Sequence, residues 1–338
     1  MELSFSHLWE GIMIDKSEKG FSFADAAFIH AENKWHAHWL KKVLDLVDWK
    51  PFEKELGKLY SPEEGRPGWD PVVLFRCLLL AEWNGLSDRQ LEEAIEFRFD
   101  FKRFSGIGLD REAPDSTTFA VFRKRIQGLY SALLKMVNRQ LEKAGFSIKK
   151  AIAVDATLVE AHSKPKKVSG GGDPDGSWRG FPVKKVVDDR GNEIISRRMA
   201  LYGYKVNVAA TIGTGFISGI SVCKASEHET HHFREFISRK TQEAYADKGY
   251  VGQRAYLDLR RIENGIQFKA TRGNPLTTPQ IARNKYITRH RRIVEGVFGS
   301  WKQWYGWRKT RFIGLLRNQL AVHLTAIAWN MKKWAVGV

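Results

Sequence analysis

The chain has 338 residues, 43% of them hydrophobic, with 55 Lys or Arg, 38 Asp or Glu and a formal net charge of +17. This length and apolar content predict two folded domains, with room for a third, and exclude a disordered basic tail. A positive surplus of this size indicates a polyanionic partner, nucleic acid first and an anionic membrane surface second.

The chain lacks the marks of a membrane or secreted protein. No apolar run approaches the roughly 18–20 residues that a membrane span requires, and residues 1–5 lack the charged and apolar blocks of a signal peptide. Cys77 and Cys223 are far apart and match no metal-ligand spacing. We therefore expect two reduced thiols in the core of a cytoplasmic protein.

Residues from about 25 to 145 are predicted to be helical. Asp70 and Pro71 form a start signal, because a capping Asp precedes a Pro at the first helical position. After a break, Ser87 is expected to cap the next helix, and Asp115 begins a third. Short helices joined by brief turns resemble a helix-turn-helix array. The alternative is a helical bundle that only packs.

The third of these helices is expected to be long and to continue past Leu133. It carries three consecutive basic residues, which we regard as candidate DNA contacts. They are Arg123, Lys124 and Arg125.

The pattern changes to strands after Lys150. The short apolar run 151–154 is predicted to be a buried strand that delivers Asp155 at its end. Further along, alternation predicts a hairpin, and apolar patterns predict mixed strands and helices. The expected order is a hairpin at 203–222, a helix at 230–239, a strand at 243–247, a helix at 253–263, a strand at 266–270 and helix from about 283.

An insertion rich in Gly, Pro and Lys separates the first strand from the hairpin. It spans about 163–200 and includes the turn-forming run 169–176. We expect a loop or a small ribbon here, at least partly mobile without DNA.

Three carboxylates stand out by their placement. Asp155 and Asp247 each end a predicted strand, and Glu295 is the single acidic residue among thirteen Lys or Arg in residues 270–338. In a mixed sheet of this order, the first and fourth strands can lie side by side, and a helix across their ends can add Glu295. Hard oxygen ligands of this kind suit Mg²⁺ or Mn²⁺, and two such ions support in-line displacement at phosphorus.

Each carboxylate also has a plainer interpretation. An Asp at a strand end is often a turn former or a helix cap, and Glu295 can be a surface residue that pairs with a neighbouring Arg. The coincidence of order, placement and basic context favours the metal-binding interpretation.

The chain resembles the DDE transposases of bacterial insertion sequences, close to the insertion-sequence-five group, over nearly its whole length. Residues 71–119 are similar to the helical N-terminal domain of that family. Val154-Asp155-Ala156-Thr157 resembles its first catalytic block, and Ala246-Asp247-Lys248-Gly249-Tyr250 resembles the second.

The third family block is Tyr, two residues, Arg, three residues, Glu, six residues and Lys. Arg291, Glu295 and Lys302 fit that spacing. Thr288 stands where the Tyr is expected, so the role of the Tyr is unfilled or moves to Tyr286.

The resemblance implies an α/β protein, α+β overall. A helical DNA-end-binding and dimerisation domain at 1–145 would precede an RNase H-like catalytic domain at 146–338 with a mixed sheet and a basic helical end. Asp155, Asp247 and Glu295 would hold two Mg²⁺ or Mn²⁺ ions. Water would then cut at each transposon end, and the freed 3′-hydroxyl would attack target DNA.

Basic and aromatic residues of the second half are candidate DNA contacts. Lys205, Lys248, Arg291, Arg292 and Lys302 are expected near phosphates. For Trp301 and Trp304, core packing is the default and stacking on a DNA base is the alternative.

Three histidines follow the hairpin, in a spacing that is not a zinc pattern. They are His228, His231 and His232. The resemblance instead places His228 and Glu229 beside the active site.

Double-stranded DNA, both inverted repeats and target, is the implied partner of a homodimer or larger assembly in the bacterial cytoplasm near the nucleoid. Two alternatives remain. One is a transposase-derived protein that binds specific DNA without cutting it. The other is an RNase H-type nuclease acting on RNA–DNA hybrids.

Overall fold

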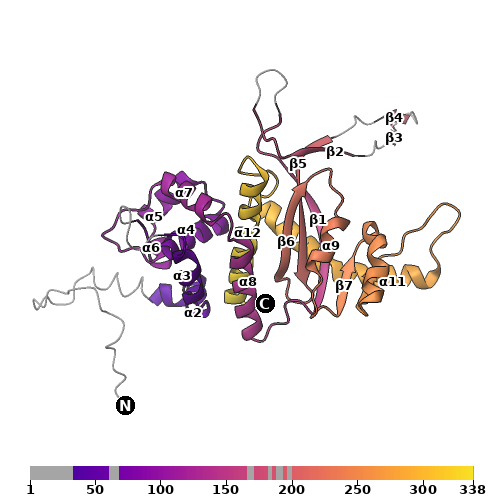
Figure 1. The fold of residues 1–338 in the computed structure, drawn as a ribbon, viewed down its shortest axis with the longest axis horizontal. Helices are drawn as coiled ribbons and strands as arrows, with labels where there is room; N and C mark the ends of the chain where they lie inside the picture. Colours follow the sequence, from indigo (N-terminus) through magenta and orange to yellow (C-terminus); the bar gives the residue numbers. More distant parts are fainter. Residues whose placement is uncertain are drawn as a thin grey trace, which may run out of the picture.

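The computed structural model describes residues 33–60, 68–165, 171–181, 185–187, 193–195 and 200–337. Helices come first, a mixed β-sheet follows, and two long helices end the chain (Figure 1). This confirms the predicted α/β class with a helical first part. Among the described residues, no helix is both long enough and apolar enough to span a bilayer.

Three helices of the first part, α4, α5 and α7, begin at the predicted caps. The Asp70 side chain accepts a hydrogen bond from Val72 N, the Asp115 side chain accepts one from Thr118 N, and Ser87 forms a capping box with Gln90. The helices are α2 (Trp39–Leu46), α3 (Lys50–Gly57), α4 (Pro71–Asn84), α5 (Asp88–Phe97), α6 (Phe99–Ser105), α7 (Ser116–Ile126) and α8 (Tyr130–Lys143).

The prediction of one long helix past Leu133 is wrong. Helix α7 ends at Ile126, a turn follows, and α8 begins at Tyr130. Gly128 lies in that turn, and glycine is a poor helix former because it loses the most backbone freedom on ordering. The break lets α8 leave the small helices and pack beside the sheet.

The sheet has its antiparallel and parallel strands on opposite sides of β1. Strand β5 pairs antiparallel with β1 and with β6, whereas β7 and β8 continue from β1 in parallel. The strands are β1 (Ala151–Glu160), β5 (Ala200–Thr211), β6 (Ile217–Lys224), β7 (Glu243–Ala246) and β8 (Glu263–Ile266). The predicted adjacency of the first strand and the strand before Asp247 is confirmed.

Strand β1 is longer than predicted. It continues to Glu160, because its second half pairs with β5, so Asp155 lies within the strand rather than at its end. The parallel pairing with β7 does stop early, at Ala153 opposite Tyr245. Asp155 therefore lies just beyond the parallel pairing with β7, as it must if Asp155 and Asp247 are to lie close together.

The insertion contributes strands of its own. β2 (Ser177–Gly180) pairs antiparallel with the start of β5, and β3 (Lys185–Val187) pairs with β4 (Glu193–Ile195) as a separate two-stranded sheet. The expectation of a small ribbon is confirmed for these residues. Residues 166–170, 182–184, 188–192 and 196–199 lie outside the described part of the chain, and so does the predicted mobility there.

Elements between β6 and the final helices are shorter than predicted. Helix α9 covers Thr230–Phe236. The helix predicted at 253–263 is α10 (Arg254–Leu259), and a 3₁₀ helix, η1 (Lys248–Gln253), precedes it. The strand predicted at 266–270 is β8, which begins three residues earlier.

Helices α11 (Thr278–Trp304) and α12 (Leu315–Val336) complete the fold. α11 packs on β1, β5 and β7, while α12 lies between the sheet and the first helices, against β6, α8, α4 and α2 (Figure 1). One hydrophobic core runs through both parts of the chain as a result.

Buried amides fasten α12 to the sheet. Asn330 Oδ1 accepts from Ile217 N at 2.7 Å, and its Nδ2 donates to Asn138 Oδ1 of α8 at 2.9 Å. Both side chains are buried, so each amide relies on the other for a hydrogen-bond partner that water cannot replace.

Candidate active site

The two aspartates lie on neighbouring parallel strands at the same level. Ala153 of β1 pairs with Tyr245 of β7, so Asp155 and Asp247 each lie two residues beyond this last pair. Residues two apart on a strand share a face. The negative charge of Asp247 acts on Asp155, as this register requires.

Helix α11 brings Glu295 toward the same place through Arg291. Arg291 Nη2 lies 2.7 Å from Asp155 Oδ2 and 3.8 Å from Glu295 Oε1. Residues four apart on a helix face the same side, so the guanidinium and the Glu295 carboxylate both turn toward β1. The three predicted carboxylates thus converge, Asp155 half-buried and Glu295 exposed.

Burial sets the electrostatic character of this cluster. It raises the pKa of Asp155 above the usual range, and the Asp247 charge acts in the same direction. Arg291 and the Ala156 amide, which donates to Asp155 Oδ1 at 2.8 Å, oppose that rise. A divalent cation at this cluster would favour the charged form of Asp155, as Arg291 does.

Arg291 was predicted to contact phosphate, which stays a prediction, and in the structure it pairs with a carboxylate of the sheet. Its side chain is buried and held by Asp155. The spacing placed it on the face of Glu295 correctly, but its partner is a carboxylate of the sheet.

Neither candidate for the family's Tyr position forms a hydrogen bond with Asp155, Asp247 or Glu295 in the described structure. Thr288 Oγ1 accepts from Gln267 Nε2 at 2.8 Å and donates to Asn284 O. The Tyr286 hydroxyl lies 3.5 Å from that of Tyr245. The role of that position therefore stays open.

Tyr250 is a site residue to which the sequence reasoning gave no role. Its ring is buried, and its hydroxyl has no hydrogen-bond partner among the described residues. Burial raises its pKa, and the charges of Asp155, Glu229 and Asp247 raise it further. A buried hydroxyl that lacks a hydrogen-bond partner and lies near three carboxylates is unusual in a folded protein and suggests a functional role. Tyr250 is part of the segment that resembles the second catalytic block of the family, and this position could have identified it as a site residue.

Glu229 lies beside Asp247, as the resemblance implied. Gly249 accepts no larger residue without movement, because a Cβ there would meet Asp247 Oδ1 at 2.8 Å and Glu229 Oε1 at 3.4 Å. Asp247 also caps η1 by accepting from Gly249 N at 2.6 Å. His228 is exposed, and its Nδ1 lies 2.8 Å from Thr230 Oγ1.

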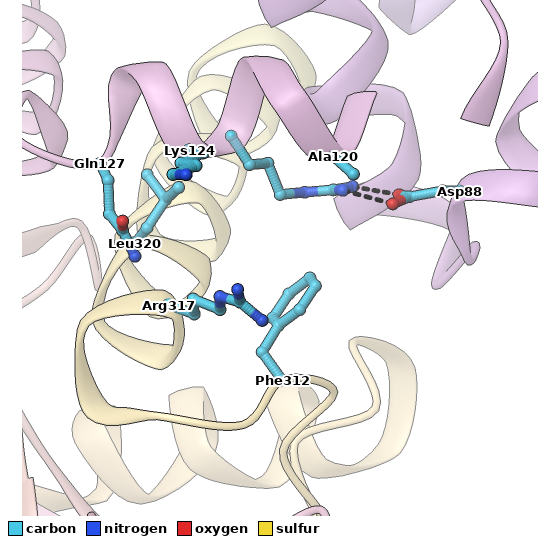
Figure 2. Close-up of a pocket in the computed structure, with 8 residues that line it drawn as sticks. Asp88, Ala120, Lys124, Gln127, Phe312, Arg317 and Leu320 are labelled. Carbon is cyan, nitrogen blue, oxygen red and sulfur yellow. Dashed lines mark hydrogen bonds and ion pairs between the residues drawn. The ribbon is translucent and has the colours of Figure 1, made fainter. Parts of the chain in front are cut away.

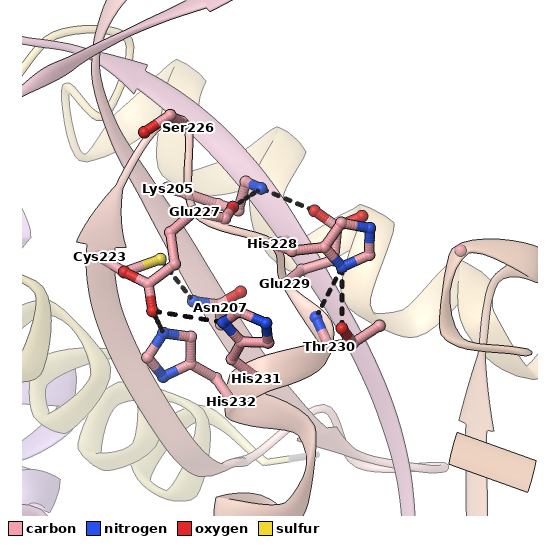
Figure 3. Close-up of polar contacts among 12 residues, drawn as sticks. Lys205, Asn207, Cys223, Ser226, Glu227, His228, Glu229, Thr230, His231 and His232 are labelled. Carbon is pink, nitrogen blue, oxygen red and sulfur yellow. Dashed lines mark hydrogen bonds and ion pairs between the residues drawn. The ribbon is translucent and has the colours of Figure 1, made fainter. Parts of the chain in front are cut away.

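The phosphate contact expected of Lys205 also stays a prediction, and in the structure Lys205 pairs with Glu229. It is 3% exposed, and its ammonium donates to Glu229 Oε2 at 2.8 Å and to the Glu227 carbonyl (Figure 3). The pair lowers the pKa of Glu229 against the opposing effect of burial. Lys205 therefore fixes the loop that presents Glu229.

His232 lies behind this loop in contact with other titratable groups (Figure 3). A hydrogen bond with Cys223 is the largest cause that raises its pKa to about 9, and Glu235 and Glu227 add to it. Its two ring nitrogens lie 3.1 Å from Glu235 Oε1 and 3.0 Å from Glu227 Oε1.

Two of the three basic residues of α7, Arg123 and Lys124, line a pocket between α7 and α12. Arg123 is not free, because its guanidinium pairs with both Asp88 oxygens, at 2.6 and 2.5 Å. Lys124 and Arg317 line the same pocket (Figure 2). Arg125 is exposed, with its guanidinium 4.8 Å from the centre of the Tyr60 ring.

Other predicted DNA contacts differ in exposure. Lys248 and Arg292 are exposed. Lys302 is half-buried, and burial, with repulsion from Arg308, lowers its pKa. DNA contact by Lys124, Arg125 and these three stays a prediction.

The two tryptophans differ in exposure. Trp301 is 2% exposed and packs edge-on against Trp329, so the suggestion that it stacks on DNA is wrong. Trp304 is 67% exposed at the end of α11. Residues three apart lie on the same side of a helix, but α11 ends at Trp304, so the spacing alone did not show that only Trp301 is buried.

The donor set fits a hard divalent cation. Three carboxylates supply oxygen ligands of the kind that Mg²⁺ and Mn²⁺ prefer, and no thiol or imidazole is among them. Burial at Asp155 disfavours an uncompensated charge there. The residues present therefore suit the metal that the resemblance implies.

Comparison with known proteins agrees with this arrangement. The model of a transposase domain of the DUF772 family matches residues 29–125, and the model of the transposase DDE domain matches residues 147–331. The transposase for insertion sequence element IS1106 of Neisseria meningitidis serogroup B is 30% identical over 211 residues, covering 61% of this chain and 73% of that protein. No solved structure matches.

Proposed function

The chain belongs to the DDE transposases of bacterial insertion sequences, and we propose that it cuts DNA at the ends of its own element and joins the freed 3′-hydroxyl to target DNA. The observation that carries this proposal is that Asp247 lies level with Asp155 on the neighbouring parallel strand, while Arg291 links Asp155 to Glu295. Asp155, Asp247 and Glu295 would hold two Mg²⁺ or Mn²⁺ ions.

The bound ions would activate the attacking oxygen and stabilise the leaving one. The protein's own residues position the reaction. Asp155 is fixed by the Ala156 amide and Arg291, and Asp247 by the Gly249 amide. Lys205 holds Glu229 beside Asp247. A carboxylate that is already fixed loses little freedom when it binds a cation, which favours a preorganised site.

The sheet supports an RNase H-like catalytic domain from about 146 to 338, because three antiparallel strands are continued by two parallel ones. The helical domain at 1–145 would bind the inverted repeats. Exposed basic residues, with the excess positive charge of the chain, suit phosphate contacts. Assembly of two or more copies on paired ends is part of the proposal.

Strand cleavage of a duplex that carries the element's own end tests this function. With Mg²⁺ or Mn²⁺, the protein should nick at the end and transfer a pre-nicked 3′ end to a second duplex. Binding without either reaction would favour a DNA-binding derivative instead. Cleavage of an RNA–DNA hybrid, but not of this duplex, would favour a hybrid nuclease.

Tyr250→Phe is expected to lower cleavage about 10- to 100-fold, the range for losing a hydrogen bond to a charged group. We assign the Tyr250 hydroxyl as a positioning donor to the carboxylates once they bind cations. The variant should therefore need more Mg²⁺ for half-maximal cleavage. Its stability toward urea should stay equal or rise, because a buried unpaired hydroxyl is removed.

Tyr245→Phe is the matched control. Its hydroxyl donates to Glu243 at 2.9 Å, so its loss should lower stability while cleavage persists. Unchanged cleavage and unchanged Mg²⁺ dependence in Tyr250→Phe would refute the assignment.

Arg291→Gln is expected to move the acid limb of the cleavage-versus-pH profile to higher pH. Arg291 opposes the effect of burial on Asp155, so its removal raises the pKa of that carboxyl further. Because the deprotonated carboxylate binds metal, activity should fall most at low pH and recover as pH rises. Single-turnover rates at fixed Mg²⁺ measure this.

Arg283→Gln serves as the control on the same helix, since Arg283 pairs with Glu263 on the surface. A loss in Arg291→Gln of equal size at every pH would contradict the electrostatic role.

A further inference from the structure

A second group of metal-binding side chains lies where β6 ends and α9 begins (Figure 3). Cys223 Sγ, a Glu227 carboxylate oxygen and a His232 ring nitrogen all lie within 4.8 Å of one another. Cys223 is buried, and Glu227 and His232 are half-buried. We propose that these three side chains bind one Zn²⁺ ion in a structural site separate from the carboxylate cluster.

The ligand chemistry favours zinc over the ions expected at the catalytic site. A thiolate and an imidazole suit Zn²⁺, whereas Mg²⁺ takes oxygen ligands almost throughout. The two sites thus select different metals from the same solution. One thiolate and one carboxylate also balance the charge of a divalent cation, so the loaded site carries little net charge.

The distances are close to those that zinc imposes. His232 Nε2 lies 3.0 Å from Glu227 Oε1. Bonds of about 2.0–2.3 Å in a tetrahedron set ligand atoms roughly 3.3–3.5 Å apart. Side-chain rotation alone can supply that adjustment, because Glu227 and His232 are both partly open to solvent.

A carboxylate behind His232 prepares the ring for metal binding. His232 Nδ1 lies 3.1 Å from Glu235 Oε1. Metal-bound histidines commonly donate their other ring N–H to a carboxylate, which fixes the tautomer and raises the basicity of the ligating nitrogen. Without an ion, both ring nitrogens face carboxylate oxygens, so Nε2 must release its proton to bind the metal, while Glu235 keeps the proton on Nδ1.

The fourth coordination position faces solvent. His231 Nδ1 lies 3.9 Å from Glu227 Oε1, and its side chain is exposed. Water or this imidazole can complete a tetrahedron there.

The location gives the ion a structural role. The ion would join the end of strand β6 to the first turn of helix α9, across the loop 225–229. That loop carries Glu229, which pairs with Lys205 and lies beside Asp247. Holding both ends of the loop would fix Glu229 at the edge of the catalytic cluster.

The spacing of the three histidines does not match a zinc pattern, because only one of the proposed ligands is a histidine. Cys223 is on β6 and Glu227 on the loop, so the set is Cys, three residues, Glu, four residues and His. The strand end and the helix start bring these positions together, which spacing alone does not reveal.

Cobalt substitution tests the site directly on the full-length protein. After dialysis against metal-free buffer, Co²⁺ should give a thiolate-to-metal charge-transfer band, and Zn²⁺ should displace it at one equivalent per chain. Cys223→Ala and His232→Gln should each lose the band. Cys77→Ala, the matched cysteine control in the helical core, should keep it, as should Asp155→Asn.

Protection from urea supplies a second readout. Zn²⁺ should raise the unfolding midpoint of the wild type and of Cys77→Ala but not of Cys223→Ala or His232→Gln. Absence of the band in the wild type, or its persistence in Cys223→Ala, overturns the proposal. If Cys223→Ala does not fold, His232→Gln decides by the same criteria. None of these readouts requires DNA cleavage.

Discussion

Asp155→Asn and Glu295→Gln should each lower end cleavage by at least about 10³-fold, because each removes a ligand worth several kcal/mol of transition-state stabilisation. Both amides keep the shape of the side chain and lose its charge, so binding to the element's end should persist. Single-turnover cleavage and end binding, measured on the same duplex, separate the two effects.

Asp258→Asn is the matched control, because it removes one charge from α10, where Asp258 accepts a hydrogen bond from Asn264. It should cut like the wild type. Equal cleavage by Asp155→Asn and Asp258→Asn would show that Asp155 is not a ligand.

Asn330→Ala should destabilise the protein by about 2–4 kcal/mol. The substitution leaves Ile217 N–H and Asn138 Oδ1 buried without their partner, at about 1–3 kcal/mol for each unsatisfied group. Ile217 O keeps a bond from Asn138 Nδ2 at 3.1 Å, which limits the loss. Urea unfolding measures the change in free energy.

Asn84→Ala, at an exposed position near the end of α4, provides the control and should change stability little. The double variant Asn138→Ala and Asn330→Ala should lose less than the sum of the single losses, since the two side chains share one network. Additive losses would contradict the coupling of α8, α12 and β6 through these amides.

The arrangement of Asp155 and Asp247 could be predicted because it follows from strand order. Apolar runs that end in Asp, with a hairpin between them, leave few ways to build a mixed sheet. The extension of β1 to Glu160 was missed, since polar residues follow Val154 and their pairing with β5 is a long-range contact.

Burial of charged groups was the least predictable feature. Lys205 and Arg291 are basic residues in a basic chain, and only the folded structure shows that each meets a carboxylate from a distant segment. Trp301 and Trp304 likewise lie on the same side of α11, and only the structure shows that Trp301 is buried while Trp304, at the helix end, is exposed. The sequence predicts the chemistry available at a site better than the partner of each side chain.

Metal specificity measured on Asp155→Cys and Asp247→Cys tests the central claim most directly, that these side chains contact the catalytic ions. A thiolate ligand disfavours Mg²⁺ and accepts Mn²⁺. Each variant should cut poorly in Mg²⁺ and at least about tenfold better in Mn²⁺, beyond any Mn²⁺ preference of the wild type and of Asp258→Cys. A Mn²⁺ preference no greater than that of the wild type, in both variants, would contradict the account.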